Sequence, residues 1–396
     1  RHERAARDRI QADFRFSFGE VMGGFRRAVS FLAAVILFTG CAAPVRQSAE
    51  YTLAEVVGSM ELKYAGQFSV DYLADGTALA EIADGRLYLI IPEGAAVPEQ
   101  IPEDITVIKQ PENIYLASSS AMDLFDCLGG LDDILATSTP ESGWKLPDIA
   151  QAMADEDILY AGKYSSPDIE LLMSEGCDAA IENTMIYHSP KIIEQIEKCG
   201  IPVLIERSSY ESHPLGRLEW IRLYGLILGR SDEAERIFSE KCALLDDVVS
   251  RESTGSTAAF FYISSNGYAV VRKPGDYISR MIGLAGGEYI LDADSLKVDE
   301  NALSTANIQF EAFYAMAKDA DYLIYNGTID GGVDSLAQLS AKNPLLSDFR
   351  AFQTGNVWCT NANVFQQTSA AAEMTEELHR IFTGGSGSFE FFHKLT

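Results

Sequence analysis

The pattern of hydrophobic and polar positions differs between two parts of the chain. Between Phe68 and Ile91, short runs rich in β-branched and aromatic residues are separated by Asp-Gly pairs at 75–76 and 84–85. An Asp-Gly pair between such runs is typical of a hairpin, because the turn needs positive φ angles. The pattern therefore predicts a small β meander over residues 68–91.

From residue 112 onward, short apolar strands alternate with helices. The predicted strands are "NIYLA", "DILYAG", "DAAIEN" and "IPVLIE", and the helices are "SSSAMDLFDCLGG", "SSPDIELLMSEG" and "HSPKIIEQIEKCG". Two helices open with Ser-Pro, and all three end at a glycine, which tolerates a left-handed helix exit. This alternation predicts βαβ units and a mostly parallel sheet.

Two consecutive helices follow, "HPLGRLEWIRLYGLILGR" and "SDEAERIFSEKCALLDDVVSRES", broken at Gly229. Apolar residues recur at helical spacing in the second one, at Ala234, Ile237, Phe238, Cys242, Leu245 and Val248. The alternation then restarts with "AAFFYI", "DYLIYN" and "NVWCT", a final helix is expected near 371–382, and the three phenylalanines of the tail are expected to dock on a surface.

The fold class predicted from these patterns is α/β. It consists of two Rossmann-like lobes with mostly parallel sheets, joined by one long helix and preceded by the β meander. Two lobes joined in this way leave a cleft, and small molecules bind preferentially at domain interfaces.

The stretch "RRAVSFLAAVILFTGCAAP" precedes all of these elements. Its apolar run, residues 28–38, is too short to cross a bilayer, which takes roughly 20 apolar residues. A basic pair, a short apolar core and small residues are instead typical of a secretory signal. The motif at 38–41 resembles the lipobox of bacterial lipoproteins, in which the cysteine, here Cys41, is acylated and becomes the first residue. A plain signal peptide with an incidental cysteine is the alternative.

These patterns divide the chain into seven segments. Because Met22 stands just before the basic pair, we expect residues 1–21 to be upstream translation. The segments are 1–21; the signal peptide, 22–40; a tether, 41–60; a β-rich extension, 61–110; the N-terminal lobe, 111–229; the linking helix, 230–254; and the C-terminal lobe with the tail, 255–396.

Charge narrows the range of partners. Residues 1–40 contain seven arginines and four acids, so residues 41–396 retain 24 of the 31 basic and 54 of the 58 acidic residues, a formal charge of −30. Such a surface repels phosphate backbones and anionic headgroups, which argues against nucleic-acid binding and leaves the lipid on Cys41 as the expected membrane contact. At 47% hydrophobic residues, the chain can build a full core.

Known catalytic and metal-binding motifs are missing from the sequence. There is no Gly-x-Ser-x-Gly elbow, phosphate-binding loop or dinucleotide fingerprint. Only two of the five histidines lie outside the N-terminal segment, the last helix and the tail, which argues against a bare transition-metal site. The cysteines form no disulfide framework, although a Cys177–Cys199 bridge remains open. We expect no catalytic residue, no cofactor and no metal ligand.

Six segments, in this order and behind a lipobox, resemble the substrate-binding lipoproteins of ABC importers for iron–siderophore complexes, haem and vitamin B12. They are "SSSAMDLFDCLGGLDDI", "YAGKYSSPDIELLMSEGCDAAI", "CGIPVLIE", "SDEAERIF", "MIGLAGGEYI" and "NIQFEAFYAMAKDADYLIYNGT". The resemblance covers most of residues 114–382, and the meander is not part of it. It implies an extracytoplasmic, lipid-anchored protein that delivers a metal chelate to an importer permease and its ATPase. A receptor for another solute, such as an oxyanion or an organic cofactor, is the alternative, and a ligand-modifying lipoprotein enzyme is a third.

In that family, an exposed acid on each lobe docks onto arginines of the permease. The matching positions here are Asp123, in "SSAMDLF", and Glu311, in "NIQFEAF". Opposite charges across an interface contribute orientation and association rate more than affinity. The alternative is that both are ordinary first-turn acids that the helix dipole favours.

Ligand contacts are expected from strand-to-helix loops that face the cleft. Aromatic faces and cations in these loops suit a large planar or partly anionic complex, although each residue is equally compatible with an ordinary core or surface position. His188 or Tyr187 could serve as an axial ligand of haem. We interpret the run "YESHPLGRLEWIR" as a structural network of ion pairs, with Arg217 bonded to Glu219 or Glu211. The ligand candidates are Trp144, Lys163, Tyr164, Tyr187, His188, Tyr268, Arg272, Lys273 and Trp358.

Overall fold

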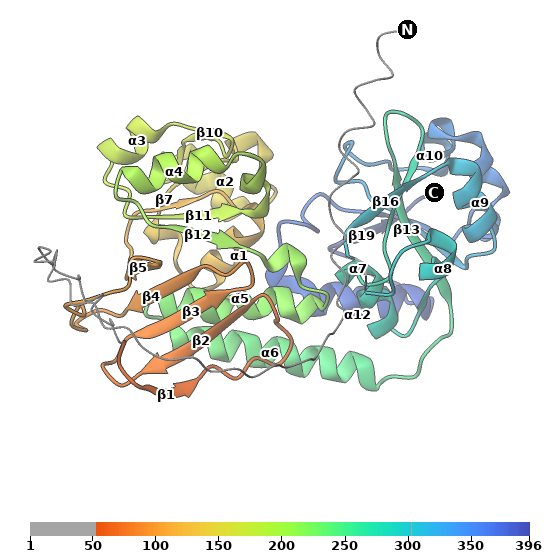
Figure 1. The fold of residues 1–396 in the computed structure, drawn as a ribbon. Helices are drawn as coiled ribbons and strands as arrows, with labels where there is room; N and C mark the ends of the chain where they lie inside the picture. Colours follow the sequence, from red (N-terminus) through yellow and green to blue (C-terminus); the bar gives the residue numbers. More distant parts are fainter. Residues whose placement is uncertain (1–52, 302) are drawn as a thin grey trace, which may run out of the picture. The chain divides into compact units, whose positions relative to one another are not determined.

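The computed structural model describes residues 53–301 and 303–396. The predictions for Cys41, the signal peptide and Met22 lie outside these residues. The chain from Tyr51 to Thr396 forms one compact unit (Figure 1). Within the described residues, no helix combines the length and apolarity that crossing a membrane requires.

The N-terminal extension is a five-stranded sheet in the order β1-β2-β3-β4-β5. Strands β2 to β4 form the predicted meander, with φ angles of 86° at Gly76 and 87° at Gly85 in the two Asp-Gly turns. Strand β5 lies parallel to β4, and β1 is added at the other edge. The strands are β1 (Val56–Ser59), β2 (Phe68–Leu73), β3 (Ala78–Ile82), β4 (Leu87–Ile91) and β5 (Ile105–Lys109).

The first lobe is built on a parallel sheet in the order β12-β11-β6-β7-β8. The predicted strands and helices are present, and the structure adds β7 and α2. The strands are β6 (Ile114–Leu116), β7 (Ile134–Thr137), β8 (Leu159–Tyr160), β11 (Ala179–Asn183) and β12 (Val203–Glu206). The helices are α1 (Ser119–Cys127), α2 (Pro147–Ala154), α3 (Ile169–Ser174) and α4 (Pro190–Lys198), and a small ribbon joins β9 (Gly162–Lys163) to β10 (Ser166–Pro167).

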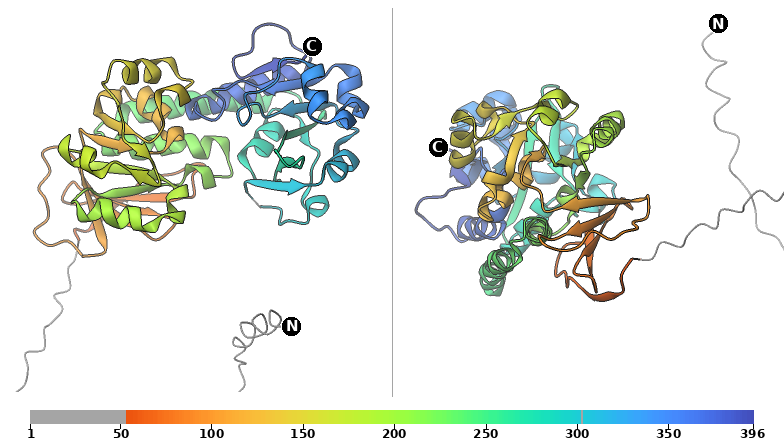
Figure 2. Two further views of the ribbon diagram at one scale, coloured as in Figure 1. Left: turned by 90° about the horizontal axis from the view of Figure 1, so that it is seen from above. Right: turned by 90° about the vertical axis from the view of Figure 1, so that its left-hand side faces the viewer.

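Three helices connect the lobes at their base (Figures 1 and 2). They are α5 (Pro214–Ile227), α6 (Ser231–Ser250) and α12 (Ala371–Phe382), and α12 packs against both of the others. The linking helix α6 buries the six apolar residues that its periodicity predicts. Five of these six residues lie in the core that the first lobe shares with the extension, and α6 also packs against α12.

The second lobe contains a seven-stranded mixed sheet with the main order β16-β14-β13-β17-β18-β19. Strands β15, β17 and β18 continue the parallel pattern from β13, whereas β14, β16 and β19 join it through antiparallel pairs. The strands are β13 (Thr257–Ile263), β14 (Ala269–Arg272), β15 (Glu288–Tyr289), β16 (Thr305–Ile308), β17 (Tyr322–Tyr325), β18 (Val357–Thr360) and β19 (Phe392–Lys394). The helices are α7 (Tyr277–Leu284), α8 (Ala293–Leu296), α9 (Phe310–Ala317), α10 (Leu336–Lys342) and α11 (Arg350–Thr354).

The tail docks as expected, because Phe391 and Phe392 are buried and β19 pairs with β18. The Cys177–Cys199 bridge that the sequence left open does not form. All five described cysteines are free thiols, namely Cys127, Cys177, Cys199, Cys242 and Cys359.

Two buried carboxylates attach the extension to α5 and the turn before it. Glu219 accepts hydrogen bonds from the backbone N–H groups of residues 63, 64 and 65, and Glu211 accepts those of residues 66 and 67. The structural interpretation of this run is confirmed, but the predicted partner of Arg217 is wrong. Its guanidinium lies 4.2 Å from the centre of the Tyr277 ring, across the two lobes.

Candidate ligand-binding site

A pocket of about 530 Å³ lies between the two lobes. Pockets of this size, formed at the carboxyl ends of strands and between domains, are where small ligands bind in α/β proteins. Its lining is polar, with few aromatic rings. The residues are Ser119, Gly143, Lys145, Arg272, Asn326, Gly327, Thr328, Ile329, Gly331, Gly332, Val333, Asp334, Thr360, Asn361, Ala362, Phe365, Gln366 and His393.

The second lobe supplies most of this lining, through the loops that follow β17 and β18. The glycine-rich loop after β17 folds tightly against β18. A side chain at Gly327 would place its Cβ 2.7 Å from the Cys359 sulfur and 2.9 Å from the Gly332 Cα. Only glycine fits there, so the close backbone packing shapes this wall of the pocket.

The first lobe contributes the loop before α2 and the start of α1. Gln366, from the second lobe, accepts a hydrogen bond from the Lys145 backbone N–H at 2.8 Å and donates one to the Gly143 carbonyl at 2.9 Å. Thr368 donates its hydroxyl hydrogen to the Ser120 carbonyl at 2.8 Å. The segment that lines the pocket from the second lobe thereby fixes the first-lobe loop.

The charged groups in the lining, besides His393, are two cations, Arg272 and Lys145, and one carboxylate, Asp334. Arg272 is half-buried, lies 3.4 Å from the Asp276 carboxylate, and sits 5.0 Å from the centre of the Phe365 ring. Lys145 is exposed at the rim. A guanidinium held by an aromatic face and an adjacent carboxylate is pre-oriented to bind a planar anionic group.

His393 lines the pocket but has no free ring nitrogen. Its Nδ1 lies 2.6 Å from the Asn361 side-chain oxygen, and its Nε2 lies 2.9 Å from the Val333 carbonyl oxygen. Within the described ranges, no three His, Cys, Asp or Glu side chains form a metal-binding group.

Asp123 has a different environment from the one expected of a docking acid. Its side chain is 4% exposed, and it accepts a hydrogen bond from the Ser369 backbone N–H at 2.6 Å, which ties α1 to the second lobe. Burial raises the pKa of Asp123 to about 6. A carboxylate covered in this way cannot reach an arginine of a permease, so the docking expectation for Asp123 is corrected. Glu311 is exposed in the first turn of α9.

Of the nine predicted ligand residues, Arg272 lines the interlobe pocket. Trp144 is buried in the first-lobe core and donates its indole N–H to the Thr139 carbonyl, so it supports the loop whose neighbours line the pocket. Tyr268 is in the β13–β14 turn, because these strands form a hairpin rather than a strand–helix unit. Lys273 follows Arg272 but does not line the pocket.

The remaining first-lobe candidates lie away from the pocket lining. Lys163 is exposed on β9, Tyr164 packs on the first-lobe core and His188 is exposed. Tyr187 contacts the extension: it donates its hydroxyl hydrogen to Asp84 at 2.7 Å and accepts a hydrogen bond from Arg207 at 2.9 Å. Its hydroxyl is thus already engaged within the protein. Trp358 lies on β18 and lines a separate pocket.

The loops that contribute most of the lining were not predicted from the sequence. The run "NGTIDGG" follows a predicted parallel strand, and a polar, glycine-rich segment at that place is a recognisable binding signal. Lys145 is the neighbour in sequence of Trp144, which was one of the predicted ligand residues. Nothing in the sequence around His393 indicates a pocket residue, because the tail reaches the pocket only through the pairing of β19 with β18.

The sheet of the first lobe also buries a carboxyl group without a partner. Glu182, near the carboxyl end of β11, is fully buried, and neither of its oxygens has a hydrogen-bond partner within the described residues. Burial raises the pKa of Glu182 to about 8, so the group is mostly protonated at neutral pH.

Comparisons with known proteins agree with this architecture. The model of the family described as periplasmic binding protein matches residues 114–364, which begin at β6 and leave out the extension. An uncharacterized lipoprotein of Methanocaldococcus jannaschii is 23% identical over 296 residues, 72% of this chain and 69% of that protein.

Two solved structures show the same fold. A periplasmic haem-binding protein of Pseudomonas aeruginosa has a TM-score of 0.56 at 16% identity, covering 72% of this chain and 98% of its own. The petrobactin-binding protein YclQ of Bacillus subtilis has a TM-score of 0.56 at 15% identity, covering 77% and 98%. The predicted fold class and the suspected family are both confirmed. The chain belongs to the periplasmic binding protein family and is therefore a ligand-binding protein rather than an enzyme.

Proposed function

We propose that this protein captures a metal chelate in the interlobe pocket and delivers it to the permease of an ABC importer. The observation that carries the proposal is the pocket of about 530 Å³, in which Arg272 and Lys145 face a wall of amides and one aromatic ring. Haem- and siderophore-binding proteins with the same fold support the choice of ligand class.

Among the three chelates considered, a ferric siderophore fits the lining best. Binding of haem takes an axial ligand from the protein, usually histidine, tyrosine, cysteine or methionine. The pocket lining holds one such residue, His393, and both of its ring nitrogens are already hydrogen-bonded. A siderophore fills the coordination shell of its iron, and its anionic oxygens suit two cations.

The test is a titration of the soluble form, residues 42–396, with ferric siderophores, haem and cobalamin, followed by tryptophan fluorescence. Trp144 stands beside the pocket loop and should report the ligand. Saturable quenching by one ferric siderophore at submicromolar concentration is the expected result. A response to simple oxyanions or organic cofactors instead would identify the other-solute receptor, and chemical change of the ligand on incubation would indicate an enzyme.

Docking onto the permease is proposed for Glu311 alone. It is exposed at the start of α9, as a docking acid must be, whereas Asp123 is buried. Glu311→Lys should reduce uptake in cells while leaving ligand affinity in solution unchanged. Uptake equal to that of the wild type would contradict this role.

We also propose that Cys41 carries a lipid that anchors the protein outside the cytoplasm. The membership of the family and the lipoprotein relative support it. Cys41→Ser should move the protein from the membrane fraction to the soluble fraction, and intact-mass measurement of the wild type should show an acylated chain. An unmodified mature chain would contradict the anchor.

A further inference from the structure

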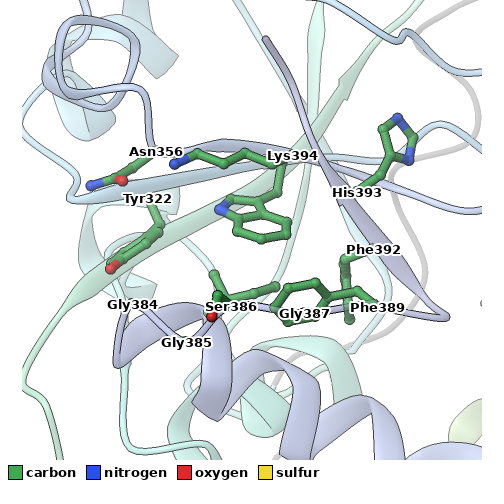
Figure 3. Close-up of a pocket in the computed structure, with 12 residues that line it drawn as sticks. Tyr322, Asn356, Gly384, Gly385, Ser386, Gly387, Phe389, Phe392, His393 and Lys394 are labelled. Carbon is green, nitrogen blue, oxygen red and sulfur yellow. The ribbon is translucent and has the colours of Figure 1, made fainter.

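A second pocket of about 530 Å³ lies in the second lobe, on the face of the sheet that α12 covers and beneath the tail at 384–389 (Figure 3). It is distinct from the interlobe pocket, and the two share only His393. Figure 3 shows His393 directed away from this second pocket, consistent with its hydrogen bonds to Asn361 and Val333.

The strand register separates the lining of this pocket into a polar part and an aromatic part. Trp358 on β18 is the direct antiparallel partner of Lys394 on β19, so both side chains lie on the same face of the sheet. In Figure 3 the Lys394 side chain extends towards Asn356, near Tyr322. Phe389 lies on the side of the pocket away from Asn356 and Tyr322. Its ring centre is 4.9 Å from that of Trp358, and the two rings meet edge to face.

The polar part contains hydrogen-bond donors without acceptors. Trp358 is 6% exposed, and its indole Nε1–H has no hydrogen-bond partner anywhere in residues 53–301 and 303–396. An indole N–H that is buried normally has a partner, because leaving it unpaired is costly. Across the same described ranges, no carboxylate lies within 4.0 Å of the Lys394 amine.

The segment over the pocket is suited to let a ligand enter. Residues 383–388 are exposed, and Gly384 and Gly387 have φ angles of 69° and 122°. Because glycine moves readily between backbone conformations, this segment can shift once the hydrogen bond that Arg380 donates to the Ser388 carbonyl, 3.1 Å long, is released. Two unpaired donors beside two aromatic rings match a flat apolar ligand that carries one anionic acceptor group.

We propose that this pocket binds a small aromatic carboxylate. Its ring lies against Trp358 and Phe389, and its carboxylate accepts hydrogen bonds from the Trp358 Nε1–H and the Lys394 amine. This site does not depend on the cargo of the interlobe pocket.

The test is calorimetric titration of the full-length protein with 2-naphthoate, and with its neutral counterpart 2-naphthamide. Saturable binding of the carboxylate is expected, and the amide should bind about tenfold more weakly, because it loses a charge-assisted hydrogen bond. Trp358→Phe keeps an aromatic ring but removes the N–H, and it should weaken binding of 2-naphthoate by about tenfold.

Lys394→Met removes the exposed cation and does not depend on the packing of the core. It should weaken binding by about fivefold, whereas Lys318→Met, the matched change at an exposed lysine of the same lobe, should have no effect. The proposal is overturned if 2-naphthoate gives no saturable signal up to about 5 mM. It is equally overturned if Trp358→Phe and Lys394→Met both bind as tightly as the wild type.

Discussion

The carboxyl ends of the parallel strands have different partners in the two lobes. In the second lobe, the loops after β17 and β18 are open to the interlobe pocket and supply most of its lining. In the first lobe, the loops after β11 and β12 contact the extension, where Tyr187 bonds to Asp84 and Arg207 bonds to Gln67. Equivalent loops thus line the interlobe pocket in the second lobe and attach an extra sheet in the first.

The largest expected effect concerns the attachment of that extra sheet. Glu219 is fully buried and accepts three backbone hydrogen bonds from the extension. Glu219→Gln removes the charge and turns an amide donor towards those N–H groups, so it should lower the free energy of unfolding by about 3 kcal/mol. Urea denaturation measures this loss.

Glu240→Gln is the matched control for this prediction. Glu240 pairs with Arg236 on the exposed face of α6, and loss of an exposed pair should cost less than about 1 kcal/mol. Equal losses in the two variants would contradict a structural role for the carboxylate of Glu219.

Substitution of Arg272 tests how much the second lobe contributes to ligand affinity. Arg272→Gln removes the guanidinium that lies over Phe365, and affinity for the bound ferric siderophore should fall by about 30-fold, as expected for loss of a charge-assisted hydrogen bond. Lys273→Gln changes the adjacent cation, which does not line the pocket, and affinity should stay within twofold of wild type. Similar losses in both variants would mean that only the general charge of this region matters.

Glu182 tests whether the sheet of the first lobe holds a buried proton. The folded protein binds this proton up to pH 8, but the unfolded chain releases it near the ordinary value of 4.5, so stability falls as pH rises between these values. Glu182→Gln cannot ionise, so its free energy of unfolding should match that of the wild type at pH 4 and exceed it by about 2 kcal/mol at pH 6. A constant difference between the two denaturation profiles from pH 4 to pH 9 would contradict the burial of an ionisable group.

The smallest effect is expected at the rim of the first lobe. Lys145→Met should weaken ligand binding by about fivefold, because an exposed cation contributes about 1 kcal/mol. Lys163→Met, an exposed cation outside the pocket, should leave affinity unchanged. If Lys163 proves the more important of the two, the ligand lies against the first-lobe loops instead of in the interlobe pocket.

Local patterns were enough to predict most of the fold. The Asp-Gly turns, the strand–helix alternation and the apolar stripe of α6 depend on neighbours in sequence, and each appears where expected. Strand β7, which directly follows a helical turn at Leu131–Asp133, was missed. The β13–β14 hairpin was missed because Asn266 and Gly267 were interpreted as part of a strand-to-helix loop.

The site was harder to predict because it depends on contacts between distant segments. Asp123 is buried by Ser369, which lies 246 residues further along the chain. Tyr187 is engaged by Asp84, 103 residues earlier, in an extension that the family pattern does not contain. Trp358 and Thr360 belong to one strand, yet they line different pockets. Residue type and loop position alone do not tell which of these residues line the interlobe pocket and which are engaged by distant parts of the chain.

The most direct test of the account is the position of iron in a crystal of the protein bound to a ferric siderophore. Anomalous scattering at the iron edge locates the metal without reference to the chelator. A single peak is expected in the interlobe pocket, bounded by Arg272, Lys145 and Phe365. A peak beside Tyr164, Tyr187 or His188 in the first lobe would contradict it.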